Sequence, residues 1–123
     1  MQTSELFRQS FVMPKNMAAD TILRTGQDFP EQFYEEYEAI SLTNIFNLVW
    51  HSKFFVDLEE ICQVYITEYE CYQISPRQVR EIMALIDQKY LCSPNKELAV
   101  FFLSLRNMCG KALITNVSLH LEL

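Results

Sequence analysis

The side chains best able to do chemistry in this chain are two histidines and four cysteines. His51 and His120 lie far apart in the sequence, and neither belongs to a recognisable nucleophile or metal-binding motif. The cysteines are spaced 9, 21 and 17 residues apart, so no pair has the close spacing of a zinc or redox site; they are Cys62, Cys71, Cys92 and Cys109. We expect buried free thiols and no catalytic residues.

Four side chains that lie near one another in the sequence are candidates for a metal site: His51, Asp57, Glu60 and Cys62. They lack the i, i+4 arrangement of His and Glu that a metal site on a helix uses. Glu60 instead falls in the first turn of an expected helix, where a carboxylate interacts favourably with the helix dipole. We therefore expect no metal, no cofactor and no enzymatic activity.

Composition indicates one folded domain and excludes several enzyme architectures. The 123 residues are 50% hydrophobic and carry a formal net charge of −6. Two glycines stand where average usage would give roughly nine. Phosphate-cradling loops and tight hairpins need glycine, so P-loop, Rossmann and tight-hairpin β architectures are excluded. Without an 18-residue uncharged apolar run or a secretory leader, we expect an intracellular protein, cytoplasmic or nuclear, that does not enter a membrane.

The elements that must position these side chains have helical patterns. Asp57 and Ser75 are each followed three positions later by Glu or Gln, as in a capping box, and Ser93 precedes a proline. Apolar residues with helical spacing follow these starts and also occupy residues 42–50, while residues 17–23 fit a short helix. We also expect a helix N-cap at Asp28, a hydrophobic staple between the side chains of Val56 and Ile61, and the end of a helix at Gly110.

The spacing of the three helix starts predicts the architecture. Asp57, Ser75 and Ser93 are 18 residues apart, so two helices occupy about 36 residues, as in stacked α-hairpin repeats. An irregular bundle of similar helices also fits. We predict an all-α fold of five or six helices. Its parts would be an N-terminal segment at 1–29, partly helical or extended, a helical core at 30–110 and a C-terminal tail at 111–123.

A stretch of the chain resembles the helical-hairpin repeats of the pentatricopeptide and tetratricopeptide type. It runs from Thr43 to Ile86, about a third of the chain, with Leu58-Glu59-Glu60 in the second helix and Ile74-Ser75-Pro76 at the step to the next repeat. Tyr72-Gln73 stands where the pentatricopeptide family has a glycine. The resemblance implies stacked antiparallel hairpins, and no base-reading residues carry over.

The C-terminal tail departs from the helical pattern. Residues 117–123 alternate strictly between apolar and polar, which is typical of a half-buried strand. A strand needs a partner, and the candidates are residues 10–13, a second copy of the chain in a homo-oligomer, or another protein. A helical interpretation also remains, because Leu113, Ile114, Val117 and Leu121 fit one helix face.

Aromatic residues and acidic charge suggest a protein partner. We expect a non-catalytic adaptor or scaffold domain that holds a partner helix or peptide in an aromatic-lined groove. The candidate partner-binding residues are Trp50, Phe54, Phe55, Tyr69, Tyr34 and Tyr37. The acidic run between Asp28 and Glu38 favours a basic partner. An RNA-binding repeat fragment and a small enzyme or metal-binding helical protein are the alternatives.

Nucleic-acid binding provides a test of this expectation. Much of its free energy comes from phosphate contacts that release counterions, and this chain of net charge −6 has no basic stripe. We expect no binding of single-stranded RNA or DNA below about 10 μM at physiological salt in a fluorescence-polarisation titration. Tight, salt-sensitive binding would favour the RNA-binding alternative.

Overall fold

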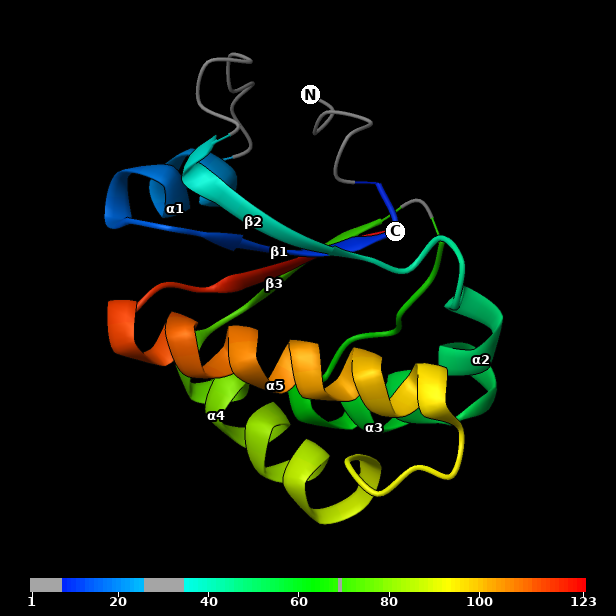
Figure 1. Ribbon diagram of the computed structural model, residues 1–123. Helices are drawn as coiled ribbons and strands as arrows, with labels where there is room; N and C mark the ends of the chain where they lie inside the picture. The colour runs from blue at the N-terminus through cyan, green and yellow to red at the C-terminus, as the bar shows by residue number, and fades with distance from the viewer. Residues whose placement is uncertain (1–7, 26–34, 69) are drawn as a thin grey trace.

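A four-stranded antiparallel sheet forms the middle layer of the molecule, in the order β2-β1-β4-β3. The computed structural model describes residues 8–25, 35–68 and 70–123. Helix α1 lies on one face of the sheet and helices α2 to α5 on the other (Figure 1). In chain order the elements are β1 (Ser10–Pro14), α1 (Met17–Arg24), β2 (Tyr37–Ser41), α2 (Phe46–His51), α3 (Phe54–Cys62), β3 (Cys71–Ile74), α4 (Pro76–Leu85), the π-helix η3 (Ile86–Tyr90), α5 (Lys96–Thr115) and β4 (Leu119–Glu122).

The sheet shows that the prediction of an all-α fold of stacked helical hairpins is wrong. Strand β3 even lies within residues 43–86, the stretch that resembles a helical-hairpin repeat. Helices connect the strands: α1 lies between β1 and β2, α2 and α3 between β2 and β3, and α4, η3 and α5 between β3 and β4. Scarce glycine therefore argues against tight hairpins but places no limit on a sheet whose strands are joined through helices.

A C-terminal strand is present as expected, but it spans Leu119–Glu122 within residues 117–123, and both of its faces are buried because helices cover the sheet on both sides. β4 pairs antiparallel with β1, with Ser10 opposite Glu122 and Val12 opposite His120. β4 also pairs antiparallel with β3, with Ile74 opposite Leu119. Because β1 and β3 occupy both of its edges, β4 is a central strand and has no free edge for a second copy.

Local signals locate some helix starts correctly. Ser75 Oγ accepts a hydrogen bond from the Gln78 N–H (3.3 Å), and Gln78 Oε1 accepts one from the Ser75 N–H (2.9 Å), so the expected capping box is present. The short helix expected at residues 17–23 is confirmed as α1, with Asn16 as its cap. The cap expected at Asp28 lies outside the described residues.

Three other helix boundaries differ from expectation. α3 begins at Phe54, ahead of Asp57, because Lys53 adopts a left-handed backbone conformation (φ 72°) that separates α3 from α2. α5 begins after Asn95, whose side chain accepts from the Leu98 N–H, and Ser93 lies outside it. α5 also continues through Gly110 and ends at Thr115, before a left-handed Asn116.

The core lies between the sheet and helices α3, α4 and α5. Phe54 and Phe102 are fully buried, with ring centroids 5.0 Å apart, and Tyr90 packs edge-on against Phe54.

Among the helices of the described residues, α5 alone is long and apolar enough to cross a membrane by length and composition. In this fold its Leu98, Phe102 and Leu105 are buried in the core.

Truncation of a core residue tests this packing. Ile82 on α4 is fully buried, so Ile82→Ala should lower the free energy of unfolding by about 2–5 kcal/mol through lost burial and an unfilled cavity. Val100→Ala, at a side chain that is 66% exposed, should change it by less than about 0.5 kcal/mol. Urea denaturation measures both values, and equal effects would contradict the assigned core.

Candidate functional site

Of the six aromatic residues proposed from the sequence, the structure describes four, and it brings Trp50, Phe54 and Phe55 together while Tyr37 lies on the sheet. Trp50 is exposed, with 43% of its surface accessible. Phe54, Phe55 and Tyr37 are buried. Tyr37 also lines a hollow of about 210 Å³ beside α1. The two remaining candidates, Tyr34 and Tyr69, lie outside the described residues.

Trp50 belongs to a cluster of three rings at the junction of α2 and α3, which we call the aromatic corner. It consists of Phe46, Trp50 and Phe55. The Trp50 ring stacks on the Phe46 ring, with their centroids 5.8 Å apart, and its centroid lies 5.7 Å from that of the Phe55 ring. Phe55 is buried and holds the cluster against the core, so Trp50 is supported on two sides while its surface stays accessible.

Sequence reasoning missed Phe46, although a signal for it was present. Phe46 lies four residues before Trp50, and residues at this spacing share one face of a helix. The contact with Phe55 depends on the turn between the two helices, where Ser52 Oγ donates to the Val49 carbonyl (2.6 Å) and accepts from the Phe54 N–H (3.2 Å).

The outer face of α3 leads away from the aromatic corner. Val56 is 54% exposed and lies inside α3, which begins at Phe54, so it does not occupy the position before the cap that a hydrophobic staple with Ile61 requires, contrary to expectation. Glu60 follows one turn later on the same face and is also exposed. This face therefore presents an apolar and then an acidic side chain to solvent.

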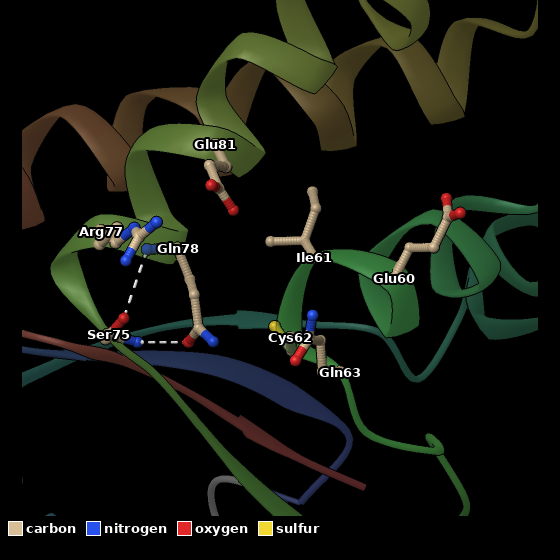
Figure 2. A pocket seen from close by; sticks show the side chains of 8 residues that line it. All are labelled: Glu60, Ile61, Cys62, Gln63, Ser75, Arg77, Gln78 and Glu81. Atoms are coloured by element: carbon tan, nitrogen blue, oxygen red, sulfur yellow. Dashed lines mark hydrogen bonds between the residues drawn. The ribbon is translucent and has the colours of Figure 1, made fainter.

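A hollow of about 770 Å³ lies where the end of α3 meets the start of α4 (Figure 2). Glu81 extends from α4 toward Ile61 of α3, and Glu60 lies at the far side. Glu60, Glu81 and Arg77 form no ion pair within the described part of the chain, so their charges remain available to a partner. The full lining is Glu60, Ile61, Cys62, Gln63, Ser75, Arg77, Gln78 and Glu81.

The thiols of this region and of the core are poor nucleophiles. Burial, together with the nearby Glu81 carboxylate, raises the pKa of Cys62 to about 11. Burial raises the pKa of Cys109 to about 12. All four cysteines are free, as expected, but Cys71 and Cys92 are exposed, so the expectation of burial is wrong for these two.

A second polar cluster, which sequence reasoning missed, lies between α1 and the sheet. Asp20 Oδ1 is 3.3 Å from His120 Nε2 and accepts a hydrogen bond from the Ser118 N–H at 3.3 Å. Asp20 Oδ2 is 3.1 Å from Arg24 Nε. The side chains of Asp20 and His120 are only 5% and 6% exposed, so the cluster fastens α1 to the sheet and leaves little access for a substrate.

The charge state of His120 follows from its surroundings. Burial lowers its pKa below the ordinary value of 6.5, and this outweighs the opposing effects of Asp20 and Glu122. His120 is therefore neutral at pH 7.

Within residues 8–25, 35–68 and 70–123, no group of three His, Cys, Asp or Glu side chains is arranged to hold a metal ion.

The comparisons with known proteins add no assignment to these surfaces. The chain matches no protein-family model, no curated protein and no solved structure. The aromatic corner presents exposed apolar area, and the α3–α4 hollow presents charged side chains that form no ion pair within the described residues.

The buried histidine predicts a specific pH dependence of stability. In the unfolded chain His120 takes up a proton as the pH falls below about 6.5, while in the folded chain its pKa is lower. The free energy of unfolding should therefore fall between pH 7.5 and about 5.5, and His120→Gln should reduce that loss. His51→Gln, at an exposed position, is the matched control. Urea denaturation at both pH values measures the effect, and an unchanged loss in His120→Gln would contradict it.

Proposed function

We propose that this chain is a non-catalytic protein-interaction domain, an adaptor or scaffold, which binds a partner helix or peptide at the aromatic corner. The observation that carries the proposal is the exposed ring of Trp50, stacked on Phe46 and supported by the buried Phe55. Tryptophan is the side chain most enriched among residues that dominate binding energy at protein interfaces.

The support beneath Trp50 favours binding for an entropic reason. A side chain that already sits in its bound position loses less conformational freedom when a partner arrives. Trp50 contacts two rings, of which Phe55 is anchored in the core, so its indole is held in place before binding.

The surface beside Trp50 is suited to an elongated partner. Val56 lies on α3 beyond the aromatic corner, and Glu60, one turn further along α3, lines the α3–α4 hollow. The residues from Phe54 to Cys62 span about 13 Å at 1.5 Å per residue, the length of two to three turns of a partner helix. One face of a partner helix would then place an apolar side chain against Trp50 and a polar side chain against Glu60.

Removing the Trp50 ring tests the proposal. Helical peptides can be selected from a displayed library on the full chain, and their affinities measured by calorimetry. Trp50→Ala should weaken the selected binders by about 30-fold or more, because truncation of an aromatic anchor costs about 2 kcal/mol or more.

Two controls make the result specific. Ile114→Ala removes another exposed apolar side chain, 88% exposed near the C-terminal end of α5, and should leave affinity within about twofold. Trp50 is the only tryptophan, so its fluorescence emission should shift when a peptide covers it. Binders that tolerate Trp50→Ala and leave its emission unchanged would contradict the proposal.

A further inference from the structure

The outer edge of β2 pairs with no other strand of the described residues. β2 is the terminal strand in the order β2-β1-β4-β3, and its five residues pair with β1 without interruption. Sheet edges are commonly protected by proline, by charged side chains, above all lysine, or by a bulge. β2 has the sequence Tyr-Glu-Ala-Ile-Ser, with no proline, lysine or bulge, and its one charged side chain, Glu38, is already 3.1 Å from Lys111.

The register decides which backbone groups of β2 point outward. The Lys15 N–H donates to the Glu36 carbonyl at 2.8 Å, and the Leu42 N–H donates to the Gln9 carbonyl at 2.6 Å. In an antiparallel pair, residues alternate between bonding to the partner strand and pointing away from it. The even-numbered residues of β2 therefore bond to β1, and the odd-numbered residues direct their N–H and C=O groups to the free edge.

Two of these odd-numbered residues have accessible backbone. Ala39 and Ser41 are exposed, and their outward N–H and C=O groups have no partner among the described residues. Together they offer two donors and two acceptors in a row. This is the pattern that an added strand recognises through its own main chain. On the opposite edge β3 has only four residues, which gives a shorter template.

A hollow beside the edge gives an added strand a place for a side chain. It measures about 240 Å³ and lies between β2 and α5. An added strand would continue the sheet past β2, and alternate side chains would point toward this hollow. The lining is Glu38, Ala39, Ile40, Ser104, Asn107, Met108 and Lys111.

Charge distinguishes the possible occupants. Glu35, Glu36 and Glu38 lie at the start of β2, against Lys15 and Lys111, and Lys111 is already 3.1 Å from Glu38. The edge is therefore acidic on balance, and the whole chain carries a net charge of −6. A second copy would bring two acidic chains and two acidic edges together, whereas a basic segment would be attracted.

We propose that β2 binds an extended basic segment of a partner protein by strand addition. The segment's main chain bonds to the outward groups of Ala39 and Ser41, and one of its side chains occupies the hollow between β2 and α5. Its basic residues lie beside the glutamates at the start of β2. This surface is separate from the aromatic corner, so the proposal holds or fails independently of the function proposed there.

A peptide titration tests the proposal on the full chain. The probe is a fluorescein-labelled peptide, Lys-Lys-Val-Thr-Val-Thr-Val-Lys-Lys, and its counterpart has every lysine replaced by glutamate. The lysine peptide should bind at least about tenfold more tightly in a polarisation titration, because only it complements the acidic edge. Equal binding of the two peptides, or no binding of the lysine peptide, would overturn the proposal.

A matched pair of variants tests the backbone contacts. Ala39→Pro removes an outward N–H without removing a hydrogen bond to β1, and its ring obstructs an added strand, so affinity should fall at least about tenfold. Ala39→Ser keeps the N–H and should bind within about twofold of the unchanged protein. Binding of Ala39→Pro equal to that of Ala39→Ser would overturn the proposal.

Two further measurements keep the test independent of how Ala39→Pro folds. A lysine peptide methylated at alternate backbone nitrogens should lose at least about tenfold in affinity for the unaltered protein, since it cannot form the same ladder. Retained affinity of that peptide would overturn the proposal. Light scattering of the chain alone should give a monomer, and a dimer that Ala39→Pro dissociates would assign the edge to a second copy and overturn it.

Discussion

The pairing of β1 with β4 is the interaction on which the rest of the structure depends. These strands come from the two ends of the described chain, and they lie side by side at the centre of the sheet. Without them β2 and β3 would lose their partners, since β2 pairs with β1 and β3 pairs with β4. A two-stranded ribbon is marginal in water by itself, so this central contact makes the four strands one sheet.

The alternation of β4 then assigns each face of the sheet its layer. Leu119 and Leu121 point to the side covered by α3, α4 and α5 and are fully buried there. His120 points to the opposite side, where it meets Asp20 of α1. A buried carboxylate is costly unless its oxygens find partners. Arg24 of the same helix provides one partner for Asp20, and His120 and the Ser118 N–H provide the others only when α1 lies against the sheet. These contacts therefore help to hold α1 on the sheet.

Both proposed surfaces follow from how the helices and strands are joined. The left-handed conformation at Lys53 ends α2 and starts α3 within a short turn, which brings Trp50 against Phe55. β2 lies at the sheet edge because the chain passes from it into α2 and returns to the sheet only at β3, on the far side. The connections thus leave the aromatic corner exposed to solvent and place β2 and β3 at the two edges of the sheet.

Features that depend on neighbouring residues could be predicted from the sequence. The capping box at Ser75, the short helix of α1 and the alternating strand of β4 were all readable, because capping and periodicity involve residues only a few positions apart. The sequence predicted only in part that Trp50, which belongs to an apolar helical pattern, is exposed. Its sequence neighbours indicated an aromatic face, and the choice between core and surface was made by packing.

Features that join distant parts of the chain were decided by the tertiary structure. β3 carries no alternating signal of its own and becomes a strand because β4 supplies its hydrogen bonds, about fifty residues later. Asp57 looked like a helix cap, yet in the fold it accepts hydrogen bonds from Lys89 and Tyr90, which the π-helix η3 brings to it. Asp20 and His120 are 100 residues apart. The sequence by itself determined the local elements, whereas the sheet, the buried contact between Asp20 and His120 and the exposed edge required contacts that no short window contains.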